Sequence, residues 1–286
     1  MVRSLRGVGE TGELLRPAMN RAVHFCAQQL QRHPYSWKLA WEAVHRIPFL
    51  LPHDKSYHAL RHFVVLRPEG LFLDIGANDG ISALSFRRFS KSYRILSLEP
   101  NVLLEPALKR LKRADPHFDY KIVAAGSASE RMRFFVPVYK NIVLHTFTSG
   151  NRDQVLEAIT KSFGRSVASA VDIRSFDSEI IPVDSLNIEP AIIKIDAEGF
   201  DYAVLKGLTA TIKRSRPFIM SEVGAAEYGQ INTFLEELRY KLLTYDIFAD
   251  TFGVARTDLS DAARTEPPHR NLFAAPDEIL ESVPIK

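Results

Sequence analysis

The stretch that most constrains the fold of this chain runs from residue 71 to residue 81, with the sequence LFLDIGANDGI. An apolar run ends in an acid, a glycine-spaced turn follows, and a helical pattern begins. This order predicts a buried strand at Leu71–Ile75, a tight turn, and a helix that reaches about Phe89 with Asp79 as its N-cap. In a doubly wound α/β sheet, a nucleotide-like ligand binds at such a turn.

The rest of the chain alternates between short apolar runs and amphipathic segments. This alternation predicts a mostly parallel sheet with helices on both faces. A polar loop around Pro267 and Pro268 is expected before the last strand. The further predicted strands are residues 93–98, 121–125, 132–138, 180–183, 192–196, 217–223, 241–248 and 271–275, and the predicted helices are residues 102–113, 204–212 and 231–238.

Two segments differ from this alternation. Residues 1–56 are predicted to form an N-terminal helical extension, with a poorly ordered tail at 1–15, a helix at 17–32, and a second helix whose face carries Trp37, Trp41 and Val44. Residues 57–286 then form the main domain. Within it, residues 139–179 are rich in Ser, Thr and Gly, and only 154–163 has a helical pattern. We expect this segment to be a substrate loop or lid, with a plain surface excursion as the alternative.

Composition limits the classes of protein to consider. The 286 residues are 46% hydrophobic, and no stretch approaches the roughly 18 apolar residues of a transmembrane helix. The N-terminus lacks a signal-peptide pattern, and the single cysteine, Cys26, excludes an intrachain disulfide, so a cytoplasmic location is expected. The net charge of +3 does not favour nucleic acid. Residues 1–70 carry a surplus of five basic residues, typical of a solvated helix face or of a surface for an anionic partner.

Acids near the first turn indicate which nucleotide-like ligand fits. Glu99 ends the second predicted strand, 25 residues after Asp74, where a carboxylate can accept hydrogen bonds from both ribose hydroxyls of NAD or of S-adenosylmethionine (SAM). A dinucleotide site requires G-x-G-x-x-G for the pyrophosphate, but here Asn78 occupies the second glycine position. Asp74 and Asp79 would repel a pyrophosphate and suit the ammonium and sulfonium of SAM. The turn therefore favours SAM over NAD.

Three blocks of sequence resemble the FkbM-type SAM-dependent methyltransferase family. They are residues 72–80, residues 98–101, and residues 193–200 followed by 204–207, and the Lys-Ile-Asp-x-Glu-Gly block at 194–199 is the most specific. The resemblance covers residues 57–276. It implies a Rossmann-like sheet of seven mostly parallel strands in the order 3-2-1-4-5-7-6, with the last strand antiparallel. The residues to which we assign cofactor binding are Asp74, Gly76, Asn78, Asp79, Gly80, Glu99, Pro100, Asn101 and Ala125.

Methyl transfer to an alcohol needs a group that removes a proton, or a metal ion that polarises the hydroxyl. Asp196 and Glu198 follow one predicted strand and Glu222 ends its neighbour, so we expect the three acids to converge. They could supply a general base or bind Mg²⁺ through oxygen ligands. Alternatively, Lys194 and backbone amides satisfy these acids and order the loop. His145 is the candidate base that is not a carboxylate.

The sequence therefore predicts a SAM-dependent O-methyltransferase. The resemblance implies an acceptor hydroxyl on a sugar, a glycolipid or a related natural product, so the expected partner is a small molecule or glycan. Two alternatives remain open: a non-catalytic SAM-fold module that binds a partner through its N-terminal helices, and an NAD-dependent oxidoreductase. The presence of Asp74, Glu99, Asp196 and Glu198 counts against the first, and Asn78 counts against the second.

Overall fold

The computed structural model describes residues 33–46, 52–224, 226–255 and 271–286. The expectations for the tail, the helix at 17–32, Cys26 and the loop around Pro267 lie outside these residues. The described chain divides into two compact units. One contains residues 33–46 and 135–174, and the other contains residues 52–134 and the described residues from 175 onward.

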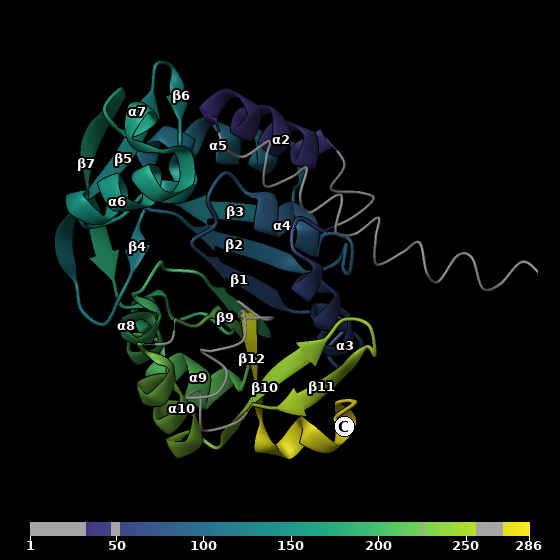
Figure 1. Ribbon diagram of the computed structural model, residues 1–286. Helices are drawn as coiled ribbons and strands as arrows, with labels where there is room; N and C mark the ends of the chain where they lie inside the picture. The colour runs from purple at the N-terminus through teal and green to yellow at the C-terminus, as the bar shows by residue number, and fades with distance from the viewer. Residues whose placement is uncertain (1–32, 47–51, 225, 256–270) are drawn as a thin grey trace, which may run out of the picture. The chain divides into compact units, whose positions relative to one another are not determined.

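The second unit is built on an eight-stranded sheet with the order β11-β10-β12-β9-β8-β1-β2-β3 (Figure 1). Strands β3, β2, β1, β8 and β9 pair in parallel, whereas β12 is antiparallel to both β9 and β10. The strands are β1 (Leu71–Ile75), β2 (Arg94–Leu98), β3 (Phe118–Lys121), β8 (Ile192–Ile195), β9 (Phe218–Glu222), β10 (Tyr240–Asp246), β11 (Thr251–Val254) and β12 (Asn271–Pro276).

The predicted count of seven strands is wrong, because β11 adds an eighth strand at the edge. Numbering the other seven strands along the chain gives the order 3-2-1-4-5-7-6. Strand β11 has only four residues, one of which is Gly253, so its sequence carries a weak strand signal. It forms an antiparallel hairpin with β10 on one side, and on the other side Phe252 exchanges backbone hydrogen bonds with Pro284 and Lys286, which are distant in the sequence.

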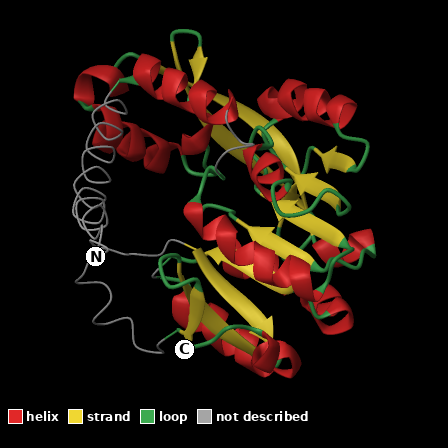
Figure 2. Cartoon of the chain, turned by 90° about the vertical axis from the view of Figure 1, so that its right-hand side faces the viewer, coloured by secondary structure: helices red, strands yellow, loops and turns green. Residues whose placement is uncertain are grey.

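Helices cover both faces of this sheet (Figure 2). Successive residues of a strand point to opposite faces, so Phe72 joins one apolar core and Leu73 joins the other. The first core contains residues of η1 (Lys55–Ala59), α3 (Leu60–Leu66), α4 (Ile81–Phe86) and α5 (Glu105–Ala114), and the second contains residues of α8 (Asp201–Lys206), α9 (Thr209–Ser215) and α10 (Tyr228–Glu237). The short helices η2 (Val102–Leu104), η4 (Val183–Leu186) and η5 (Asp277–Ser282) complete this unit.

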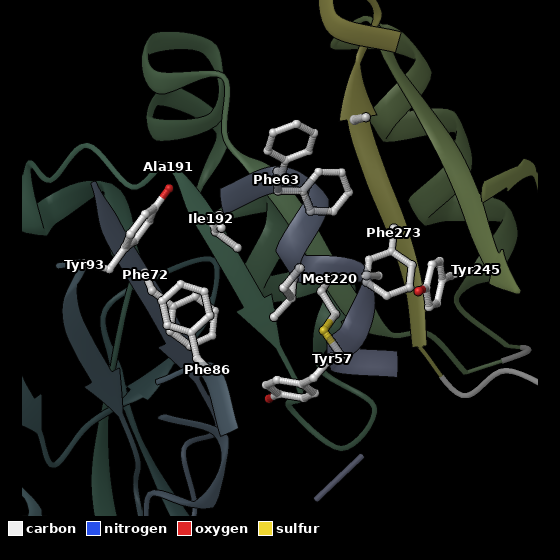
Figure 3. Packing of buried hydrophobic residues seen from close by; sticks show 14 of the residues in the cluster. Tyr57, Phe63, Phe72, Phe86, Tyr93, Ala191, Ile192, Met220, Tyr245 and Phe273 are labelled. Carbon is white, nitrogen blue, oxygen red and sulfur yellow. The ribbon is translucent and has the colours of Figure 1, made fainter. Parts of the chain in front are cut away.

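Aromatic rings dominate the first core (Figure 3). Phe72 of β1 stacks on Phe86 of α4 with ring centroids 4.1 Å apart, and Tyr93 meets Phe86 edge-on at 5.3 Å. Tyr57 of η1 is 1% exposed and belongs to the same core. Buried aromatic pairs contribute about 0.5–1.5 kcal/mol beyond their burial. This packing fixes α4 against β1 and so positions the turn between them.

Two predicted elements have different limits in the structure. The predicted third strand at 121–125 is divided: β3 ends at Lys121, and β4 (Ala124–Ala125) pairs with another sheet. The apolar run continues past Lys121, but its later residues pair with a strand of the other sheet. The predicted helix at 204–212 is interrupted at Gly207, where an added Cβ would lie 1.9 Å from the carbonyl oxygen of Gly126.

A smaller four-stranded sheet has the order β4-β7-β5-β6, with β5 (Glu130–Tyr139), β6 (Ile142–Val143) and β7 (Val171–Ile181). The predicted hairpin arm at 132–138 is confirmed by the antiparallel pairing of β5 with β6. Strand β7 has 11 residues and begins inside the segment that we expected to be irregular. Its mixed polar sequence hides the strand pattern. Both β5 and β7 have residues in each unit.

The first unit has its own apolar core. Trp37 packs there with Leu144, Ile159 and Val167, so part of the predicted extension and part of the predicted lid share one core. Its elements are α2 (Pro34–Arg46), η3 (His145–Phe147), α6 (Arg152–Phe163), α7 (Arg165–Ala168), β6 and the adjoining ends of β5 and β7. None of the helices in the described parts of the chain is both long and apolar enough to cross a membrane.

Candidate active site

The turn after β1 is closed by backbone contacts from both neighbouring strands. The N–H groups of Gly76 and Ala77 donate to the carbonyl of Leu98 at the end of β2, at 2.9 and 3.2 Å. Gly76 has φ 73°, and an added Cβ would lie 1.9 Å from the backbone oxygen of Asp196. Only glycine fits such a left-handed, crowded position. The turn therefore lies against β2 on one side and the end of β8 on the other.

The role of Asp79 as N-cap is wrong. The N-cap of α4 is Gly80, which has a left-handed backbone with φ 92° and provides no side-chain cap. The helix ends at Phe86 rather than near Phe89. Asn78 is also left-handed, with φ 54°, so three of five residues between 76 and 80 adopt positive φ. Helix α4 therefore begins after a turn with several left-handed residues and without a side-chain cap.

Asp74 is completely buried and bonded within the fold. Its Oδ2 accepts hydrogen bonds from the hydroxyls of Ser82, at 2.5 Å, and Ser97, at 3.0 Å. Its Oδ1 lies 3.5 Å from Nζ of Lys194. A buried carboxylate is tolerated when hydrogen bonds and a cation compensate it. The expected attraction between Asp74 and a cationic ligand is therefore reduced, and its direct contacts are with α4, β2 and β8.

Glu99 connects the first turn to the end of β2. Its Oε2 accepts the N–H of Asn78 at 2.8 Å, and its Oε1 accepts the N–H of Asn101 at 2.9 Å. Burial raises the pKa of Glu99 to about 7, although these two hydrogen bonds and the charge of Lys194 lower it. Asn101 is buried, and its side chain caps η2 by accepting the N–H of Leu103. The structure therefore brings Glu99 and Asn78, both assigned to cofactor binding from the sequence, into direct contact.

Lys194 is the cation at the centre of this site. Its Nζ donates to the carbonyl oxygens of Gly76, at 2.7 Å, and Ile75, at 3.2 Å, and lies 3.3 Å from Oδ2 of Asp196. Burial lowers the pKa of Lys194, but the charges of Asp196, Asp74 and Glu99 and a hydrogen bond to Asp196 outweigh burial and leave the pKa above its usual value. The ammonium therefore stays charged. Of the acids Asp196, Glu198 and Glu222 that we expected Lys194 to satisfy, Asp196 lies within ion-pair distance.

The three predicted catalytic acids have different surroundings. Asp196 has a side chain 34% exposed and is paired with Lys194. Glu198 is exposed and has a left-handed backbone with φ 48°, followed by Gly199 with φ 89°. Glu222 is half-buried at the end of β9, opposite Asn271 of β12. Among the described residues, no group of three or more His, Cys, Asp or Glu side chains is arranged to bind a metal ion, so the predicted magnesium set is not formed.

A buried acid that the sequence did not single out lies beside this loop. Asp201 is 1% exposed, and its Oδ1 accepts the hydroxyl of Ser221 at 3.0 Å. Burial raises the pKa of Asp201 to about 6, with hydrogen bonds from Ser221 and the Ala197 backbone opposing and the charges of Asp196 and Glu227 adding to the rise. Through its hydrogen bond with Ser221, Asp201 therefore links the loop that follows β8 with strand β9. The block at 194–199 ends two residues before it, so the motif boundary excluded it.

His53 is a second residue that the sequence pattern did not indicate. Its Nδ1 lies 2.7 Å from the Ser85 hydroxyl, which also accepts the backbone N–H of His53 at 3.0 Å. Surrounding protein atoms lower its pKa to about 4 by desolvation, although the side chain retains exposed surface. Asp54 raises this pKa and Lys194 lowers it. His53 was assigned to the N-terminal extension, and only the folded chain brings it near the charges of this site.

The remaining predicted residues lie in other surroundings. Pro100 is half-buried beside Glu99, as expected from its position in the chain. Ala125 belongs to β4 of the small sheet rather than to the third strand of the large one. His145 lies in the first unit, where its ring packs edge-on against Trp37 at 5.2 Å and Trp41 at 5.1 Å. His145 therefore has an aromatic environment typical of a core histidine.

These features define a doubly wound α/β protein with a ligand-type turn at the carboxyl ends of its strands. The sheet order reverses between β1 and β8, and such a switch point is where open α/β sheets bind ligands. Residues 74–242, more than half of the chain, match the methyltransferase FkbM domain. The chain therefore belongs to the FkbM methyltransferase family, and the predicted resemblance is confirmed.

Two solved methyltransferase structures match this chain at low sequence identity. The chain is similar to the methyltransferase FkbM of Methylobacillus flagellatus KT, with 14% identity and a TM-score of 0.44 over 82% of this chain and 58% of that one. It is also similar to the precorrin-6y C5,15-methyltransferase of Geobacter metallireducens GS-15, with 11% identity and a TM-score of 0.37 over 76% of this chain and 83% of that one. No curated protein matches the sequence.

Proposed function

We propose that this protein is a SAM-dependent O-methyltransferase whose acceptor hydroxyl belongs to a sugar, a glycolipid or a related natural product. Membership of the FkbM methyltransferase family supports methyl transfer and favours it over the NAD-dependent alternative. The acceptor class comes from the family resemblance at residues 193–200 and is part of the proposal.

The observation that carries the cofactor assignment is the arrangement of Glu99. Backbone N–H groups from Asn78 and Asn101 hold its two oxygens, so the carboxylate joins the turn after β1 to the end of β2. A carboxylate at this position can accept the ribose hydroxyls of an adenosyl ligand. The crowded position of Gly76 excludes a side chain, and a backbone without a side chain suits the close approach of a ligand.

Acids that follow β8 would remove the proton of the acceptor hydroxyl. SAM, when bound, supplies an electrophilic methyl group on a positively charged sulfur. Asp196 is our candidate for removing the acceptor proton, because its carboxylate faces both Lys194 and solvent at the switch point. Glu198, on the exposed left-handed turn, is the second candidate. Glu222 and His145 remain weaker candidates, since the first ends a neighbouring strand and the second packs edge-on against two tryptophans.

The first unit is our candidate for acceptor selection. It is connected to the second unit through β5 and β7, and it contains residues 139–174, most of the segment that we predicted to form the substrate loop or lid. Loops carried on a rigid sheet are common carriers of specificity. The proposed division is that the second unit binds the cofactor while the first unit contributes to recognition of the acceptor.

Calorimetric titration with SAM, S-adenosylhomocysteine (SAH) and NAD tests the cofactor assignment. We expect binding of SAM and SAH but not of NAD, and a large loss of affinity in Glu99→Ala. Glu105→Ala, which changes an acid in α5 outside the turn, is the matched control. Tight NAD binding, or unchanged SAM affinity in Glu99→Ala, would contradict the assignment.

The catalytic part needs a separate experiment. Incubation with methyl-labelled SAM and a panel of glycans, glycolipids and polyketide-type alcohols should transfer label to a hydroxyl. Asp196→Ala and Glu198→Ala should lower this turnover while retaining SAH binding. If the protein binds SAM but labels no acceptor in the panel, the non-catalytic module becomes the better description.

A further inference from the structure

Lys194 makes contacts that a charge-neutralising lysine does not need. Asp74 and Lys194 are register partners on the adjacent parallel strands β1 and β8, which places both side chains on the same face of the sheet. From there the ammonium extends beyond Asp74 and donates to two backbone carbonyls, those of Ile75 and Gly76. Its shortest contact is the 2.7 Å bond to Gly76 rather than a contact with a carboxylate.

These carbonyls belong to the turn that we propose binds the cofactor. The N–H groups of Gly76 and Ala77 are held by Leu98, so the turn is fixed from the β2 side through its donors. Lys194 fixes it from the β8 side through its acceptors. A charged donor strengthens such hydrogen bonds to about twice the strength of neutral ones. The turn therefore has two anchors, and the second one is a side chain.

The same ammonium also fixes Asp196. Its Nζ lies 3.3 Å from Oδ2 of Asp196, and the side chain of Lys194 is only 6% exposed. A buried ammonium with an oxygen environment on several sides has little freedom to move, so its partners are held at defined positions. One cation thus links the turn after β1 to the candidate base after β8.

We propose that Lys194 is a positioning residue for this site, which sets the turn at Ile75 and Gly76 for the cofactor and holds Asp196 beside it. The proposal rests on the proposed function, since it assigns Lys194 a role in the same cofactor site. Removing the donors of Lys194 takes a charged hydrogen bond from the Gly76 carbonyl and leaves the Ile75 carbonyl with the N–H of Asp196. The turn then relaxes, and cofactor affinity falls even when the fold persists.

A single substitution cannot test this, because Lys194→Met also leaves Asp74 buried without its cation. Breaking a buried ion pair by removing one partner is strongly destabilising. The double variant Lys194→Met with Asp74→Asn removes both charges, and the amide that replaces the carboxylate retains an oxygen for Ser82 or Ser97. The variant Lys194→Gln with Asp74→Asn is also neutral but retains N–H donors for the turn. Lys206→Met, an exposed lysine on α8, is the control.

The measurements are the SAH dissociation constant by calorimetry and the melting temperature of each variant. The Met double variant should melt above the Met single variant, yet bind SAH about tenfold or more weakly than wild type. The Gln double variant should bind more tightly than the Met double variant, and Lys206→Met should match wild type. This separation of affinity from stability is not expected of a purely structural lysine.

Three outcomes decide the matter. Wild-type affinity in a folded Met double variant overturns the positioning role of Lys194. Equal affinity of the Met and Gln double variants also overturns it, because the donors would then be irrelevant. If the Met double variant does not fold, the single variant Asp74→Asn is measured as a reference. A Gln double variant with wild-type affinity then supports the proposal, and one that is folded but as weak as Asp74→Asn alone opposes it. Absence of SAH binding in wild type instead contradicts the proposed function.

Discussion

Asp74 and Glu99 are both buried carboxylates, yet the fold compensates their charges differently. Two hydroxyls and an ammonium contact the carboxylate of Asp74, so groups from three elements compensate its charge. Glu99 accepts the backbone N–H groups of Asn78 and Asn101, and burial raises its pKa to about 7. An acid of this kind is charged only near and above neutral pH. The two carboxylates therefore differ in their properties because different atoms surround them.

The raised pKa of Glu99 predicts a pH dependence of cofactor binding. The charged carboxylate is the better acceptor for two hydroxyls, and below pH 7 the free protein must first lose a proton. The SAH dissociation constant should therefore rise about tenfold between pH 8 and pH 6, measured by calorimetry. Glu99→Gln should bind weakly at both values. A dissociation constant for wild type that does not change across this range would show that Glu99 does not make the proposed contact.

At the level of elements, close backbone contacts determine where helices end. The chain at 201–215 carries one amphipathic pattern, but the structure divides it into α8 and α9 at Gly207. There the backbone passes so close to Gly126 that a Cβ would lie 1.9 Å from its oxygen. Gly126 directly follows β4, so this contact joins the helix pair to the end of a strand of the small sheet.

Gly207→Ala is therefore expected to destabilise the protein. The new methyl group collides with backbone atoms, which cannot move as a flexible side chain can, and overpacking of this kind costs about 1–3 kcal/mol. Gly229→Ala in α10 is the matched control, because no atom lies within 4 Å of the position that an added Cβ would take and alanine favours a helix. Urea denaturation measures both. Equal stability of the two variants would contradict the close contact at Gly207.

For the whole molecule, the residues of the proposed cofactor site and most of the candidate acceptor segment belong to different units. The turn after β1, Glu99, Lys194 and Asp196 all belong to the second unit. Trp37, His145 and the helix α6 belong to the first unit, which has its own apolar core. Damage to that core should therefore affect the two functions unequally.

Ile159→Ala tests this separation. Ile159 is fully buried in the first unit, and truncating such a side chain costs about 2–5 kcal/mol. We expect a lower melting temperature and reduced methyl transfer to the acceptor, with an unchanged SAH dissociation constant below the transition. Ile193→Ala, equally buried in β8 beside Lys194, is the comparison and should weaken SAH binding. If Ile159→Ala weakens SAH binding to the same degree, the proposed division of roles is wrong.

Local patterns in the sequence determined much of this protein. The mostly apolar run at 71–75 is typical of a strand that is buried on both faces of a sheet. Strand β1 has these same limits, and all of its residues are buried. The block around Glu99 and the Lys-Ile-Asp-x-Glu-Gly block identified the family and indicated the strand ends of the proposed site. These features are local, since they depend on residue spacing within one strand, turn and helix.

Tertiary structure decided what depends on distant partners. Gly80 replaces Asp79 as the N-cap, β11 is held on its outer side by residues 284–286, and His53 approaches the charges of Lys194 and Asp74 from a segment assigned elsewhere. The compensation of Asp74 required Ser82, Ser97 and Lys194 to meet from three elements. Spacing along the chain places a charge at a strand end, but its surroundings in the folded protein determine whether that charge is available to a ligand.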